Sequence, residues 1–319
     1  MKTLLVLIKR NIFVFCKDKA NLFYSSLSML IIIMLMLVFL GNMNVDMVNG
    51  SLRDADKMMQ GVTLPMDQLM EGDRDSSKDD ANARNLVLSM IIAGLTVVNG
   101  VTVSLGVIGL MVEDEAQNRL SSFYVSPVSR SVLVLAYILA AFILSIAFGV
   151  VTVLISEVVL VMSGGTMLTT IQLIKVSGLI ILNSFSATCF MFFLSTFAHS
   201  LSAYSGLSTL VGTLVGFISG MYLPMGVLPE TVKKVLVLFP ICSGSAWMRE
   251  VFTEEAAART FAGLPKQGLE FYREYSGITL KFADMEISNL IKFLILFGSG
   301  ILFIIISAII LRKKNVRDR

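Results

Sequence analysis

Residues 176–229 read VSGLIILNSFSATCFMFFLSTFAHSLSAYSGLSTLVGTLVGFISGMYLPMGVLP, a run of 54 residues without Asp, Glu, Lys or Arg. One helix crosses a bilayer in about 20 residues. The run is therefore long enough for two spans, and the polar cluster STFAHSLS at 195–202 is the natural break between them. This stretch predicts a hairpin of two membrane-spanning helices, at 174–196 and 203–222.

The whole chain of 319 residues has the composition of a membrane protein. It is 55% apolar and 15% charged, whereas an average soluble domain has about 25% charged residues. Transmembrane β-strands alternate apolar and polar residues, but the apolar runs here are continuous. We therefore expect an all-α integral membrane protein with six transmembrane helices in one domain over 1–319. Besides the hairpin, the predicted spans are 20–40, 86–111, 132–162 and 291–311.

Positive charges flank the first and last spans and predict the orientation of the chain. Five bases occur in 2–19 and five in 312–319. An even number of spans puts both ends on one side, and the positive-inside rule puts that side in the cytoplasm. We expect a multi-pass protein of the cell membrane, in a bacterial plasma membrane, with external loops at 41–84 and 223–290. The net charge of +3 is then a topology signal and does not indicate nucleic-acid binding.

Two short segments outside the spans suggest helices at the membrane surface. Residues 2–19 alternate apolar clusters with cations, which suits an N-terminal interfacial helix. At 229–239, Pro229 and Glu230 are typical of a helix start, and apolar residues follow at helical spacing. That helix is too short to span the membrane, so we expect it to lie in the outer interface or to dip partway into the membrane.

Small residues in the fifth span predict a close packing face, within the bundle or across a dimer, with a substrate-lining role second. These residues are Gly206, Gly212, Gly216 and Gly220.

The sequence lacks the motifs of an enzyme or a metal protein. There is no GxxxxGK[ST] phosphate loop and no HExxH, and the three cysteines have no paired spacing. The one histidine, His199, lies in the break between two spans, where a structural role is expected. We expect no catalytic residue, no metal site and no cofactor in this chain.

Few ionisable residues fall within the spans. Glu157 and Lys175 lie on either side of the turn at 163–166. We favour an ion pair between them across the hairpin, with substrate contact as the alternative. Asn99 and Asn183, together with Glu157, are candidates for a polar path.

The stretch EDEAQNRLSSFYVSPVSR at 113–130 separates the second and third spans. Its three leading acids suit the first turn of a restarted helix, and Ser126 and Pro127 suit the start of the third span. An apolar stripe at helical spacing runs between them, formed by Ala116, Leu120, Phe123 and Tyr124. The pattern fits a cytoplasmic helix that docks a partner, and it fits a helix on the membrane surface equally well.

Two stretches, together with the layout of six spans, resemble a known family. They are VEDEAQNRLSSFYVSPVSRSVLVLAYIL at 112–139 and FISGMYLPMGVLPETVKKVLVLFPICSGSAWMREVF at 217–252. They are similar to segments of the ABC-2 type permeases, the transmembrane subunits of ATP-binding cassette exporters. The resemblance extends over nearly the whole chain.

The resemblance implies a permease that moves substrate out of the cytoplasm. Two copies of a separate cytoplasmic ABC ATPase would bind ATP and Mg, and a second permease copy would complete a homodimer or a heterodimer. A drug, an antimicrobial peptide or a lipid-like compound would be the substrate, and export would give multidrug or peptide resistance.

The resemblance also implies two sets of functional residues. A coupling helix at 113–125 would contact the ATPase, with the adjoining residues of the third span. The residues expected to couple are Glu113, Asp114, Glu115, Ala116, Arg119, Leu120, Phe123, Tyr124, Pro127 and Arg130. Short re-entrant helices on the outer side would contain Gly220, Pro224, Pro229, Pro240 and Arg249.

Two other functions fit the composition. A non-transporting immunity or sensor protein would bind an extracellular peptide with its external loops, and a neighbouring gene for an ATPase would argue against it. An ion-coupled secondary carrier is disfavoured because few charges occur near the membrane centre.

Overall fold

The structure, a computed structural model, describes residues 2–19, 34, 45–53, 75–120, 128–198, 200–282 and 285–317. Within this part of the chain, five helices contain segments long and apolar enough to cross a membrane. They are α4 (Asp79–Ala116), α6 (Arg130–Met162), α7 (Thr170–Ser195), α8 (Leu201–Ile218) and α12 (Asn289–Arg317). The protein is an all-α integral membrane protein, as the sequence predicts.

These five helices overlap five of the six predicted spans. The sixth, at 20–40, lies outside the described residues except for residue 34, and so does most of the predicted loop 41–84. Residues 45–53 of that loop are helical.

Helix α8 ends before the predicted boundary at 222. It stops at Ile218 in a Schellman motif, in which the Met221 N–H donates to the Gly216 carbonyl at 3.0 Å. Gly220 has a φ of 68°, a left-handed conformation that glycine adopts without steric cost. The chain therefore turns away from the helix axis at this point.

Helix α4 forms the centre of the bundle. Of its most apolar 18-residue window, 89% is buried inside the structure, against 39% for α6 and 17% for α12. Polar side chains connect it to its neighbours: Asn99 Nδ2 donates to Thr152 Oγ1 of α6 at 2.6 Å, and the hydroxyls of Ser104 and Thr188 of α7 lie 3.0 Å apart. Such bonds satisfy polar groups that lipid cannot.

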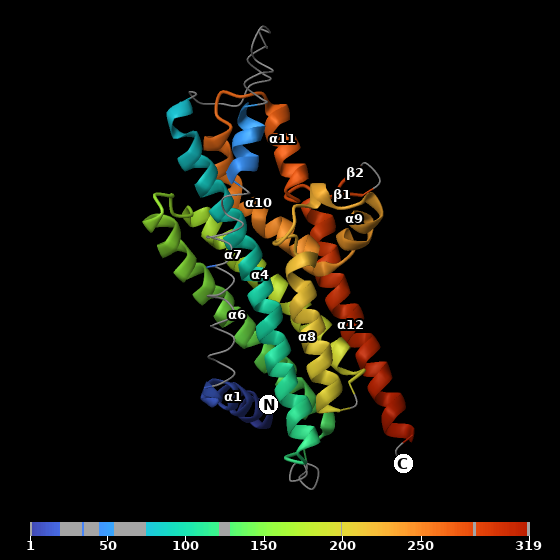
Figure 1. Cartoon of the computed structure of the whole chain (residues 1–319). Helices are drawn as coiled ribbons and strands as arrows, with labels where there is room; N and C mark the ends of the chain where they lie inside the picture. The colour runs from blue at the N-terminus through green and yellow to red at the C-terminus, as the bar shows by residue number, and fades with distance from the viewer. Residues whose placement is uncertain are drawn as a thin grey trace.

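Helix α1 (Lys2–Lys17) lies across one end of the bundle, and α12 ends at that same end (Figure 1). We call it the α1 end. Leu7 and Phe15 pack into the core, whereas Val6 and Phe13 are more than half exposed. Because one side faces the protein and the other is apolar and free, α1 has the form of an interfacial helix.

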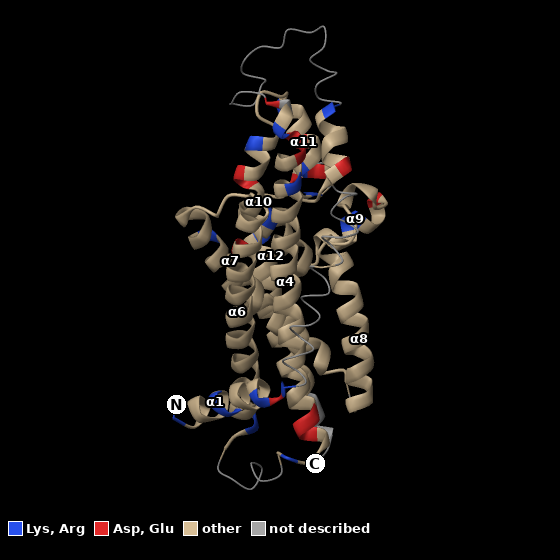
Figure 2. Ribbon diagram, turned by 60° about the vertical axis from the view of Figure 1, so that its left-hand side comes forward, with Lys and Arg blue, Asp and Glu red and all other residues tan. Residues whose placement is uncertain are grey.

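The opposite end, which we call the α11 end, is built from shorter elements. They are η3 (Ser76–Lys78), η4 (Met225–Val227), α9 (Glu230–Val237), α10 (Pro240–Thr260), α11 (Lys266–Tyr275) and an antiparallel pair of strands, β1 (Lys281–Phe282) and β2 (Met285–Glu286). Helices α9 and α10 meet at an angle of 89°. The predicted external region 223–290 is thus largely folded, and charged side chains gather at both ends of the molecule (Figure 2).

Replacement of Gly244 by Ala tests the packing of α10 on α7. A Cβ at Gly244 would lie 1.8 Å from Asn183 Oδ1 and 2.9 Å from Asn183 Cγ, so the Asn183 side chain must leave this position. We expect a loss of about 1–3 kcal/mol in stability, as for other overpacked cores, measured as a lower melting temperature in detergent. Gly178→Ala on α7 is the matched control, because nothing lies within 4 Å of its Cβ position. Equal melting temperatures for both variants would contradict the described packing.

Candidate functional site

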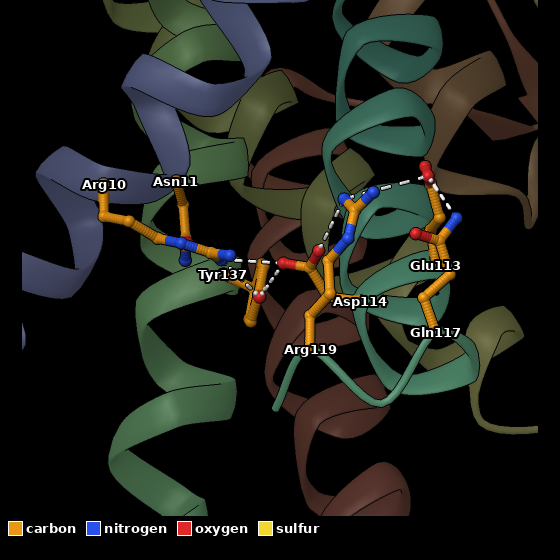
Figure 3. A network of polar contacts seen from close by, with 7 residues as sticks. All are labelled: Arg10, Asn11, Glu113, Asp114, Gln117, Arg119 and Tyr137. Atoms are coloured by element: carbon orange, nitrogen blue, oxygen red, sulfur yellow. Dashed lines mark hydrogen bonds and ion pairs between the residues drawn. The ribbon is translucent and has the colours of Figure 1, made fainter. Parts of the chain in front are cut away.

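The C-terminal end of α4 brings charged and polar residues from three helices together (Figure 3). The side chain of Asp114, in the last turn of α4, is 0% exposed. Its Oδ2 accepts hydrogen bonds from Arg10 Nη1 of α1 and from the Tyr137 hydroxyl of α6, both at 2.7 Å. Its Oδ1 accepts one from Arg119 Nη1 at 3.3 Å. One carboxylate thereby joins α1, α4 and α6.

Arg10 is held firmly in this network. Its Nη1 also donates to the Tyr137 hydroxyl at 2.8 Å and to Asn11 Oδ1 at 3.0 Å. Burial alone lowers the pKa of Arg10, but the hydrogen bond with Asp114 and the neighbouring charges outweigh that effect, so the pKa is raised. Arg10 therefore stays positively charged and offsets the buried carboxylate.

The chain leaves α4 through a Schellman motif. The Arg119 N–H donates to the Asp114 carbonyl at 2.9 Å, and the Asn118 N–H donates to the Glu115 carbonyl at 3.1 Å. Asn118 has a φ of 54°, the left-handed conformation that this motif requires and that asparagine tolerates better than most residues. The motif places Arg119 beside Asp114, so backbone and side chain of Arg119 both bind that residue.

The predicted restart of a helix at Glu113, Asp114 and Glu115 is wrong. These acids lie in the last turn of α4, where the helix dipole disfavours negative charge. The apolar run before them is long enough that α4 continues through them, and Arg10 and Arg119 compensate for the unfavourable position of Asp114.

The predicted apolar stripe does not form one docking surface. Ala116 is exposed, but Leu120 is only 4% exposed and packs in the hydrophobic core. Arg130 begins α6. The remaining predicted coupling residues lie outside the described part of the chain: Phe123, Tyr124 and Pro127.

A different set of residues is exposed where α4 ends. We call this set the α4 tip, and its members are Glu115, Ala116, Gln117, Asn118 and Arg119.

Comparison with known proteins assigns the chain to a family. A family profile described as "ABC-2 family transporter protein" matches residues 52–309, well over half of the chain. The chain belongs to the ABC-2 family of transporter proteins. No curated protein matches it. ABC-2 proteins are transmembrane components of transport systems and work with an ABC ATPase subunit. The resemblance predicted from 112–139 and 217–252 is confirmed.

At the α11 end of this ABC-2 protein, Arg249 of α10 joins two helix ends. Its side chain is buried, and it donates from Nη2 to the Ser219 carbonyl at 2.7 Å and from Nη1 to the Ser276 carbonyl at 3.3 Å. Ser219 ends α8 and Ser276 ends α11, and each precedes a glycine of positive φ, Gly220 or Gly277. The guanidinium thus lies between two helix C-termini, whose partial charges sum to about −1.

The residues predicted for the external region fall into two groups. Gly220 and Pro224 line a cavity of about 30 Å³ together with Arg249. Pro229 and Pro240 lie apart from it, at the starts of α9 and α10, where their fixed φ suits a helix beginning.

The predicted ion pair between Glu157 and Lys175 is wrong. Lys175 Nζ lies 3.5 Å from Glu254 Oε2 of α10. Glu157 Oε2 accepts a hydrogen bond from the Leu168 N–H at 3.0 Å. The turn between α6 and α7 thus offers Glu157 a backbone donor, while a carboxylate on α10 is within reach of Lys175.

The two asparagines of the predicted polar path have separate roles. Asn99 contributes to the contact between α4 and α6, and Asn183 Nδ2 donates to the Leu179 carbonyl of its own helix at 2.9 Å. The four predicted intramembrane residues therefore do not form one group.

Sequence reasoning missed several functional contacts. Arg10 was interpreted as one of the terminal cations and as part of the interfacial helix, without a partner, and Tyr137 was not singled out. Lys292, the last charge before the apolar run of α12, is buried and its Nζ lies 2.9 Å from Glu250 Oε2 of α10. The position of Lys292 directly before the apolar run was the one sequence feature that could have indicated this contact.

Replacement of Asp114 by Asn tests the network at the α1 end. The buried pair loses its negative charge, and we expect a loss of about 2–3 kcal/mol, near the low end for a broken buried pair because Arg10 is 30% exposed. The melting temperature in detergent and the rate of tryptic cleavage within α1 measure the effect. Glu113→Gln, at a side chain 33% exposed, is the control and should change neither. Unaltered cleavage of Asp114→Asn would show that the network does not hold α1.

Replacement of Arg249 by Lys tests the clamp between α8 and α11. Lysine keeps the charge but loses the planar fork that reaches two carbonyls. We expect a loss of about 1–3 kcal/mol, because a buried carbonyl is left without a donor. Arg259→Lys on the same helix alters an exposed pair with Glu255 and should change the melting temperature little. The clamp is disproved if both variants melt like the wild type.

Proposed function

We propose that this ABC-2 protein is the permease subunit of an ABC exporter and that its ATPase partner contacts the α4 tip. The observation that supports this most directly is the buried Asp114 network behind the tip. A displacement of exposed residues 115–119 would pull on Asp114, since Arg119 binds that residue with its backbone N–H and its side chain.

Arg10 and Tyr137 would then transmit the displacement. Both donate to the same carboxylate oxygen, from α1 and from α6. A force on the tip would act on three helices at once. The central position of α4 would extend that force into the bundle, because α6, α7, α8 and α10 all pack against α4.

The α1 end would face the cytoplasm. The first and last described helices, α1 and α12, both reach this end (Figure 1), and the sequence has five bases in 2–19 and five in 312–319. Under the positive-inside rule these charges favour a cytoplasmic position. The α11 end would then lie outside, and transport would run from the α1 end outward.

The working assembly would contain two permease copies and two ATPase subunits, which bind ATP and Mg. Helix α8 supports a role in the permease dimer: only 22% of its apolar window is buried in this chain, and the space beside Gly206 and Gly212 is open. Gly216, in contrast, packs against Tyr222 of the same chain, because a Cβ there would lie 2.1 Å from the Tyr222 ring. A homodimer is the simplest arrangement.

The substrate we propose is an amphipathic compound: a drug, an antimicrobial peptide or a lipid-like molecule. The bundle interior is apolar between hydrogen-bonded polar pairs, which does not suit a small inorganic ion. A cavity of about 420 Å³ at the α11 end, lined by Phe271, Tyr275 and lysines, has the size of small-molecule sites.

Charge reversal at the α4 tip tests the proposal. The permease is co-expressed with the ATPase of a neighbouring gene, and copurification and ATPase stimulation are measured. We expect Glu115→Arg combined with Ala116→Arg to reduce both by about tenfold, which corresponds to the loss of about 1.4 kcal/mol of binding free energy. Leu120 is unsuitable for this test, because its burial would confuse misfolding with loss of docking.

Glu270→Arg is the control for the added charge. Glu270 is exposed on α11 at the opposite end, so this variant should bind and stimulate the ATPase like the wild type. Full copurification and transport by the tip variant would refute the proposed contact.

A further inference from the structure

A polar cavity of about 100 Å³ lies between α4, α10 and the turn that joins α6 to α7. The charged residues in its lining are Glu157 of α6 and, on α10, Glu255 and Arg259. Asn85 of α4 also faces it. Neither the family assignment nor the proposed ATPase contact accounts for this cavity.

Glu157 is the main acid of the cavity. It is 7% exposed and forms no ion pair with any residue that the structure describes. Among the residues that the structure describes, only the Leu168 N–H donates a hydrogen bond to it, at Oε2, although a carboxylate offers about four acceptor positions. Most of its capacity to accept hydrogen bonds is therefore unused within the described structure.

Asn85 adds a second acceptor. Its Nδ2 donates to the Gly164 carbonyl at 3.4 Å, but its Oδ1 is buried and has no hydrogen-bond partner. A buried acceptor without a donor costs about 1–3 kcal/mol. In this conformation protein atoms cover the oxygen, so the Asn85 side chain must rotate toward the cavity before a donor from outside the chain recovers that free energy.

The one base in the lining is already paired. Arg259 Nη2 lies 3.5 Å from Glu255 Oε2, one turn earlier on the same helix. These two charges offset each other, and the charge of Glu157 remains. The cavity thus combines a net negative charge with unsatisfied hydrogen-bond acceptors. This chemistry favours a ligand that is a cation and donates hydrogen bonds.

We propose that this cavity binds a primary alkylammonium group. Such a group supplies three N–H donors and one positive charge, which match Asn85 Oδ1 and the Glu157 carboxylate. The volume equals about three water molecules at about 30 Å³ each, enough for an aminoethyl group. A coordinated metal ion fits less well, because among the described residues no three His, Cys, Asp or Glu side chains form a metal-binding group.

The ammonium group has two sources, a free amine or the aminoethyl headgroup of a lipid. Both offer the same chemistry to Glu157. The site lies toward the α11 end, away from the proposed ATPase contact, so binding there can be measured without the ATPase.

Titration of the full-length protein with ethanolamine hydrochloride tests the proposal. The protein is reconstituted in nanodiscs of phosphatidylcholine, whose quaternary ammonium has no N–H donor, and the melting temperature is followed. We expect a saturable increase with ethanolamine and none with ethylene glycol, its neutral analogue. Glu157→Gln keeps an acceptor for Leu168 but removes the charge, and it should weaken ethanolamine binding about tenfold or more.

Glu254→Gln is the matched control. It removes a carboxylate of α10 that pairs with Lys175 and does not line the cavity, and it should bind ethanolamine like the wild type. Wild-type affinity in Glu157→Gln, or an equal effect of ethylene glycol, overturns the proposal and leaves a cavity filled with water. If Glu157→Gln does not fold, Asn85→Ala takes its place, with the same expected loss and the same overturning result.

Nanodiscs that contain phosphatidylethanolamine distinguish the two sources. If the lipid headgroup is the ligand, wild-type protein in these nanodiscs melts higher than in phosphatidylcholine and gains nothing from added ethanolamine. If a free amine is the ligand, ethanolamine stabilises the protein equally in both lipids. Each result supports the site and identifies its source.

Discussion

The carboxylate of Asp114 lies at the C-terminal end of the central helix, without exposed surface and where the helix dipole disfavours negative charge. Removing such a charge from water costs several kcal/mol unless other groups compensate. Here the compensation comes from Arg10, Tyr137 and Arg119, which belong to α1, to α6 and to the segment after α4. The docking of α1 and α6 therefore stabilises the end of α4 in this position.

At the α11 end, a buried positive charge stabilises helix ends, whereas at the α1 end the buried charge is negative. Helices α8 and α11 both end in Schellman motifs inside the protein, and their last carbonyls need donors. Arg249 supplies them from α10, and two helix dipoles offset its charge, with no ion pair to an acid in the described part of the chain. Both ends of the molecule thus use one buried charged side chain to fix how helices terminate, while polar pairs such as Asn99 and Thr152 fix the middle.

Long apolar runs made most of the fold predictable, because crossing a bilayer demands continuous apolar helices. Apolar runs did not predict where the helices end. The acids at 113–115 are typical of a helix's first turn, yet they lie in the last turn of α4, where Arg10 and Arg119 offset the charge of Asp114. The ion-pair partner of Lys175 was not predictable either. Glu157 is closer to Lys175 in the sequence, but Glu254 is the acid that lies beside it in the structure. Leu120 packs in the hydrophobic core, so the predicted docking stripe was wrong at this residue.

Helix α4 has 38 residues, a length of about 57 Å at 1.5 Å per residue, nearly twice the hydrocarbon thickness of a bilayer. It is one uninterrupted rod that begins beside the Asn85 cavity and ends at the Asp114 network. A rod that tilts about its middle moves its two ends in opposite directions. If ATPase engagement tilts α4, ligand affinity at the far end changes, and by thermodynamic reciprocity a ligand there alters ATPase affinity by the same factor. Because α4 is one continuous helix, binding at one side of the membrane would alter binding at the other side.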